Sequence, residues 1–249
     1  MFATLVALNG TALVVFGGVT LTAVGNVATI SAKVWLYSTT AAAWSVVPVA
    51  GPSGGAFGAA RGLLARMDGS LALLVWGGRV AGSSSPLFNA SVCDVAQLET
   101  SPALVCAAHV PLIGAAYQGA YATAGNALYV FGGNDGTNAA TNTFTVVSLP
   151  PGSGVVEVNK LRYNVDEPWQ PRTGASLVRV ATDMVLFGGV NLQTGLFYND
   201  MWKVVGSANE ALRSEFEFAS STSPPPPRAY HACERSVLCV RWVSHEVML

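Results

Sequence analysis

Strand-length runs of apolar residues alternate along this chain with glycine, asparagine, serine and proline, and four of the runs end in a glycine pair. The pairs recur at roughly 55–60 residues, a spacing typical of one four-stranded propeller blade and longer than a solenoid turn. The pattern therefore predicts four copies of one antiparallel sheet. The pairs are Gly17-Gly18, Gly77-Gly78, Gly132-Gly133 and Gly188-Gly189.

Apolar alternation and turn residues divide each unit into four predicted strands. Two-residue turns such as Asn9-Gly10, Asp68-Gly69 and Gly125-Asn126 join first strands to second strands. We expect one all-β domain over 1–249, with units at 1–50, 51–110, 111–161, 162–222 and a partial unit at 223–249. The predicted strands are 2–8, 12–17, 32–38, 43–48, 59–66, 71–77, 91–97, 103–109, 117–123, 127–132, 142–148, 155–161, 173–180, 183–188, 199–205, 214–219, 229–234 and 237–243.

Further residues recur around the glycine pairs. Arg61 and Arg172 stand at the same interval before a glycine pair, and Pro227-Arg228-Ala229-Tyr230-His231 opens the last unit. Aromatic residues follow the pairs. With these residues the sequence resembles the Kelch repeat, in which Pro-Arg-x-x-His, a hydrophobic run into Gly-Gly, and Asn-Asp-x-Trp succeed one another. The aromatic residues concerned are Trp35, Trp44 and Trp202.

The resemblance implies a Kelch-type β-propeller of four four-stranded blades plus a C-terminal half blade. Known Kelch rings have more blades, so we expect an incomplete ring and favour a fragment of a longer chain. The alternative is a smaller ring in which the terminal strands of the first and last units share a blade. Glycine pairs suit sharp turns with positive φ. The large rings are expected to fill the wedge between blades. For Arg61, Arg172 and Arg228 we favour a structural role, tying blades together by hydrogen bonds.

Composition narrows the classes of partner. Net charge is −1 and no basic stripe occurs, which argues against nucleic acid. No apolar stretch reaches the ~20 residues that a spanning helix needs. Charged residues make up 11% of the chain, against roughly 25% in ordinary soluble domains. Packing against neighbours, glycan cover, or a lineage rich in alanine and valine would each explain this deficit.

The four cysteines form two local pairs on adjacent predicted strands. Cross-strand neighbours lie within reach of a bridge, so we expect disulfides between Cys93 and Cys106 and between Cys233 and Cys239; four buried thiols are the alternative. Asn9 and Asn89 head Asn-x-Ser/Thr sequons and are glycosylation candidates. Together these features favour a secreted or extracellular protein, with a cytoplasmic one as the alternative.

No catalytic constellation is evident. His109, His231 and His245 are the only histidines, and they belong to an outer strand and the terminal half unit, so we predict no metal and no cofactor. No nucleophile elbow or phosphate loop occurs. Carboxylates are sparse, and no general acid/base pair is indicated. We therefore predict that the protein is not an enzyme.

These features predict a non-catalytic binding or scaffold module that recognises a protein or a glycan through the connections between strands. Two alternatives remain open, an intracellular Kelch adaptor with reduced cysteines and a fragment of a galactose-oxidase-like copper enzyme. The contact candidates, chosen by loop position, are Arg79, Asn134, Asp135, Asn138, Asn191, Gln193 and Tyr198.

Overall fold

The computed structural model is all-β over the residues that it describes. These are 4–8, 11–21, 28–31, 33–51, 59–65, 70–79, 87, 90–95, 98, 103–109, 117–137, 139–149, 156–160, 170–180, 183–205, 215–218, 226–230, 232–233 and 239–240. Within them, no helix is long and apolar enough to cross a membrane. Asn9, Asn89, Asn138, His231 and His245, which the sequence analysis singled out, lie outside the described residues.

Four antiparallel sheets follow one another along the chain as the blades of a β-propeller. The first contains β1 (Thr4–Ala7), β2 (Ala12–Phe16), β5 (Val34–Ser38) and β6 (Ala43–Val47). The second contains β8 (Ala60–Ala65), β9 (Leu71–Trp76), β10 (Ala90–Asp94) and β11 (Leu104–His109). The third contains β12 (Ala120–Ala124), β13 (Ala127–Phe131), β14 (Phe144–Ser148) and β15 (Glu157–Lys160). The fourth contains β16 (Ser176–Val180), β17 (Asp183–Phe187), β20 (Met201–Val205) and β21 (Glu215–Phe218).

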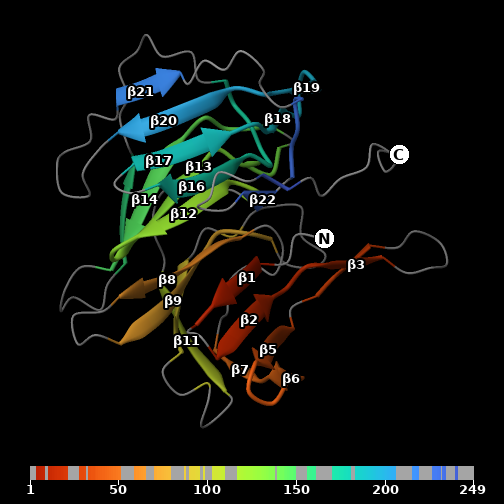
Figure 1. Cartoon of the computed structure of the whole chain (residues 1–249), viewed down its shortest axis with the longest axis vertical. Coiled ribbons are helices and arrows are strands. Elements are labelled where there is room, and N and C mark those ends of the chain that lie inside the picture. Colours follow the sequence, from red (N-terminus) through yellow and green to blue (C-terminus); the bar gives the residue numbers. More distant parts are fainter. Residues whose placement is uncertain are drawn as a thin grey trace.

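The first strands of the blades lie against one another. β12 lies next to both β8 and β16, and β1 lies next to β8. The predicted half blade is described only as a ladder of β22 (Ala232–Cys233) and β23 (Cys239–Val240), and β22 lies next to β16. In Figure 1 the first sheet, red to orange, lies at one end of the row of sheets and the fourth, blue, at the other.

Apolar side chains fill the wedges between neighbouring blades. Phe16 and Val14 of the first blade form one buried cluster with Leu73 and Cys93 of the second. A second cluster joins Trp76 of the second blade to Leu128 of the third. A third cluster joins the third and fourth blades and includes Phe131, Phe144, Leu186 and Trp202. Since each blade buries faces against its neighbours, the sheets are stable only as a stack.

Five short strands were not predicted. β3 (Val19–Leu21) pairs with β4 (Ala28–Ile30), and β18 (Val190–Asn191) pairs with β19 (Leu196–Phe197); both hairpins follow glycine pairs. β7 (Val49–Ala50) pairs in parallel with β11, so residues 49–50 extend the second sheet rather than the first. Two- and three-residue strands carry too little periodicity to be read from sequence.

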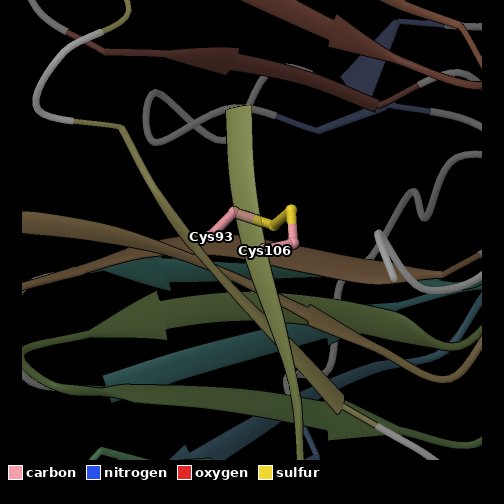
Figure 2. The surroundings of a disulfide bond; sticks show 2 residues. All are labelled: Cys93 and Cys106. Carbon is pink, nitrogen blue, oxygen red and sulfur yellow. A yellow bond between two sulfur atoms is a disulfide. The ribbon is translucent and has the colours of Figure 1, made fainter. Parts of the chain in front are cut away.

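One predicted disulfide is confirmed. Cys93 on β10 pairs directly with Cys106 on β11, and their sulfur atoms are 2.09 Å apart. Figure 2 shows the bond joining the two strands. Both residues are buried in the cluster between the first and second blades. Cys233 and Cys239 are also direct cross-strand partners, but the structure does not describe their side chains, and that bridge stays a prediction.

The described bridge closes a short loop, because its cysteines are 13 residues apart. Loop-closure entropy for this length corresponds to about 3 kcal/mol. We therefore expect reduction to lower the free energy of unfolding by up to about 3 kcal/mol. The measurement is urea unfolding with and without reductant in a Cys233→Ser/Cys239→Ser background, which confines the effect to this bridge. Equal stability of the oxidised and reduced forms would show that the bridge does not constrain the chain.

Candidate functional site

The four glycine pairs mark equivalent ends of the blades, where the second strand of each sheet ends. The first glycine of each pair has φ between 59° and 66°, and the second has φ between 83° and 113°. Four repeats of one backbone conformation confirm that the pairs are corresponding corners. We call the surface formed by the connections at these ends the loop face. Its described segments are 17–21, 28–31, 33, 77–79, 87, 132–137, 139–143 and 188–200, with 117–119, 170–175 and 226–230 between blades.

The glycine pairs also receive the next blade. A Cβ on Gly132 would lie 2.3 Å from the carbonyl oxygen of Arg172, which belongs to the following unit. A Cβ on Gly189 would lie 3.1 Å from the carbonyl oxygen of Thr173, which belongs to the same unit. Close approach of the next blade therefore requires glycine at Gly132, and positive φ favours glycine at both positions.

Main-chain hydrogen bonds between blades repeat in register. The amide of Gly133 donates to the carbonyl of Arg172 (2.9 Å), and the amide of Arg172 donates to the carbonyl of Thr141 (3.1 Å). One unit later, the amide of Gly189 donates to the carbonyl of Arg228 (2.8 Å), whose own amide donates to Tyr198 (3.0 Å). Arg172 and Arg228 are thus equivalent residues. Hydrogen bonds between blades were predicted for these arginines, and their backbone amides and carbonyls make such bonds.

The Arg172 side chain is the centre of a buried polar network. Its Nη1 and Nη2 atoms donate to the two carboxylate oxygens of Asp200 at 2.5 and 2.7 Å, and Nη1 also donates to the Gly188 carbonyl at 3.0 Å. Trp202 Nε1 donates to Asp200 Oδ2 at 2.7 Å. The guanidinium lies 4.1 Å from the Tyr198 ring centroid. Because Arg172 is only 1% exposed, these bonds compensate its burial and fix the loop that follows Gly188.

Arg61 does not occupy the position of Arg172, although both stand at the same interval before a glycine pair. Ala60 is the residue paired with Trp76, whereas Ser176 is paired with Phe187. The first hairpin of the second blade is therefore longer, and it carries Arg61 into β8, while Arg172 precedes β16. Arg61 is 3% exposed and lies over the Phe16 ring of the first blade at 5.4 Å. Burial lowers the pKa of its guanidinium to about 10, against a raising influence of Tyr121.

Three residues one unit apart form a hydrogen-bonded chain across the blades. The amide of Tyr230 donates to the carbonyl of Gly174 (2.6 Å), and the amide of Gly174 donates to the carbonyl of Gln118 (2.9 Å). All three have left-handed backbones, with φ of 62°, 63° and 54° for Gln118, Gly174 and Tyr230. Burial raises the pKa of Tyr230, which a hydrogen bond with Thr173 opposes. Only one of the three residues is glycine, so the repeat could not be recognised from residue type. An alignment of the last three units in register would have revealed it.

Two of the predicted contact residues support their own loops. The side-chain oxygen of Asn134 accepts the amide of Gly136 at 2.8 Å. The side-chain oxygen of Asn191 accepts the amides of Gln193 at 2.9 Å and Thr194 at 3.2 Å. Asn134 is 2% exposed and Asn191 is 7% exposed. These are turn-forming asparagines, and we assign both side chains to the shape of the loops.

The other predicted contact residues differ in accessibility. Gln193 is exposed at the tip of the hairpin formed by β18 and β19. Asp135, Tyr198 and Arg79 are half-buried, and Arg79 lies over the Tyr117 ring at 5.3 Å, joining the loop of the second blade to the third. Desolvation raises the pKa of Asp135, but hydrogen bonds from Thr137 and from backbone amides outweigh it, so the pKa lies below its ordinary value.

Sequence reasoning missed the apolar residues at the same hairpin tip. Leu192 is 38% exposed and Leu196 is 56% exposed, on either side of Gln193 and Thr194. The contact candidates in this connection were its polar and aromatic residues, so the two leucines were passed over. Across the described residues, no group of three or more His, Cys, Asp or Glu side chains could hold a metal ion.

The sheets, the repeated corners and the loop face together define a Kelch-like β-propeller fold. The solved structure of YjhT, a Kelch-repeat protein, is similar, with a TM-score of 0.69 and 14% sequence identity over 94% of this chain and 73% of YjhT. At this identity the likeness shows the fold alone. No family model matches the chain, and no curated protein matches its sequence.

Two tryptophans of the expected pattern lie in different environments. Trp202 is 8% exposed and lies between the third and fourth blades, as expected. Trp44 is 52% exposed, so its predicted place in a wedge between blades is wrong. It lies on the face of the first sheet that no other described sheet covers.

Proposed function

We propose that this protein is a non-catalytic recognition module that binds a protein or glycan partner on its loop face. The observation that carries the proposal is the hairpin of β18 and β19. Its tip exposes leucines and polar side chains together, a mixture suited to partner contact.

The base of this hairpin is rigid. The amides and carbonyls of Thr173 and Val190 exchange two hydrogen bonds of 2.9 Å, and the Asn191 side chain closes the turn. The Arg172 side chain binds the chain on both sides of the hairpin, at the Gly188 carbonyl before it and at the Asp200 carboxylate after it. A tip fixed in this way binds with little loss of conformational entropy, which favours affinity.

The test is binding of the purified chain to an array of purified proteins and an array of purified glycans. A Leu192→Ser/Gln193→Ala/Leu196→Ser variant is expected to lose at least about tenfold in affinity for any ligand found, because each change removes exposed contact atoms. Val105→Ser is the matched control, since Val105 is 58% exposed on β11, away from the loop face.

Both variants should keep the melting temperature of the wild type, because all substituted side chains are exposed. Absence of ligands on both arrays, or ligand binding that the hairpin variant retains in full, would contradict the proposal.

A further inference from the structure

The half-exposed Arg228 side chain belongs to the segment that borders the β18–β19 hairpin on the loop face. The backbone amide of Arg228 donates to the Tyr198 carbonyl at 3.0 Å, directly after β19. Its Nε donates to the Pro226 carbonyl at 3.1 Å, and Arg172 makes the same bond to the Gln170 carbonyl at 3.2 Å. Equivalent backbone bonds and an equivalent Nε bond therefore hold the two guanidinium groups in corresponding positions.

The two guanidinium groups differ in what their outer nitrogen atoms bind. Both Nη atoms of Arg172 donate to the Asp200 carboxylate. Among the described residues, the Nη atoms of Arg228 have no hydrogen-bond partner. A guanidinium fork donates two parallel bonds to a carboxylate, and the Arg172 pair shows this choice of ligand within the same fold. The group that Arg228 is prepared to bind is thus a carboxylate.

The neighbouring hairpin adds an apolar contact. Leu192 and Leu196 are the two large apolar side chains that the described part of the loop face exposes, and residues 190–197 include no charged residue. A Cβ on Gly195 would meet nothing within 4 Å, so the space beside the tip is open. An aliphatic side chain has no polar atom with which to hydrogen-bond a sugar, and it gains free energy only when apolar surface covers it.

We infer that the partner of the loop face is a folded protein whose apolar groove receives the tip of the β18–β19 hairpin and whose carboxylate, at the rim of that groove, binds Arg228. This inference rests on the proposed function and names the class of its partner. The two contacts act differently: a charge at the rim of an interface mainly raises the association rate, and buried apolar contacts mainly slow dissociation.

The experiment probes an array of purified proteins and an array of purified glycans with the purified chain, and then measures the kinetics of each ligand found by surface plasmon resonance. Arg228→Glu is expected to lower the association rate at least about tenfold at about 50 mM salt, and much less at about 500 mM, because salt screens the rim charge. Leu196→Ser is expected to raise the dissociation rate. Lys33→Glu is the matched control: it makes the same change of charge at an exposed residue on the first blade's side of the loop face, and should bind as the wild type does.

The possible results separate this inference from the proposed function. Ligands on the protein array whose association depends on Arg228 and whose dissociation depends on Leu196 would support it. Ligands on the glycan array alone would overturn the inference and leave the proposed function standing, whereas ligands on neither array would contradict both. Protein ligands that bind Arg228→Glu as fast as the wild type, or that respond equally to Lys33→Glu, would overturn the carboxylate contact. Circular dichroism of each variant checks that it is folded.

Discussion

Replacing Arg172 by alanine is expected to lower the free energy of unfolding by about 3–5 kcal/mol, because it removes a buried guanidinium and leaves the partly buried Asp200 carboxylate without its cationic partner. The Asp200 carboxylate would lose both donors of its bidentate pair, and the Gly188 carbonyl would lose its bond at 3.0 Å. In a chain of this size the melting temperature would fall by roughly 10 °C. Thermal and urea unfolding provide the measurement.

Arg228→Ala is the matched control. Arg228 occupies the equivalent position one unit later and makes the same backbone bonds, but its side chain is half-exposed and its Nε donates to the Pro226 carbonyl at 3.1 Å. We expect its loss to cost under about 1 kcal/mol. Equal effects of the two substitutions would mean that the Asp200 network does not stabilise the fourth blade.

Gly132→Ala is expected to cost about 2–5 kcal/mol, the sum of a left-handed backbone penalty and overpacking. The new methyl group would lie 2.3 Å from the Arg172 carbonyl oxygen, and the contacting atom is backbone, which cannot move aside cheaply. The third and fourth blades would have to separate at this corner. Urea unfolding of the purified variant measures the cost.

Gly125→Ala separates the two contributions. Gly125 has φ +59°, close to the +65° of Gly132, but a Cβ there would meet nothing within 4 Å. It should cost only the left-handed penalty of about 1–2 kcal/mol. If Gly132→Ala were no worse than Gly125→Ala, the close approach between blades would have no energetic weight.

The sequence predicted the sheets well because their two strongest signals are local. Alternating apolar residues such as those of Ala12–Phe16 report a half-buried strand directly, and the glycine pairs report a corner that no other residue adopts easily. The pairing of Cys93 with Cys106 followed from the same strands. These features depend on a few neighbouring residues, and so they can be read without the fold.

The residues that the sequence analysis misplaced have positions that depend on contacts between distant parts of the chain. Arg61 was aligned with Arg172 by counting from the glycines, but a longer hairpin turn shifted it into a strand. Trp44 was expected in a wedge because aromatic residues usually are, yet the first sheet has no described neighbour on that side. The contact candidates were chosen by loop position, which cannot tell the exposed Gln193 from the buried Asn134.

Neighbouring units are joined through peptide groups as much as through side chains. The amides of Gly133, Gly189, Gly174 and Tyr230 all donate to carbonyls of an adjacent unit. Every amino acid has a backbone carbonyl, so substitutions at most positions leave these hydrogen bonds between blades intact. Such a fold therefore tolerates very different sequences: this chain and YjhT share 14% identity and superimpose with a TM-score of 0.69.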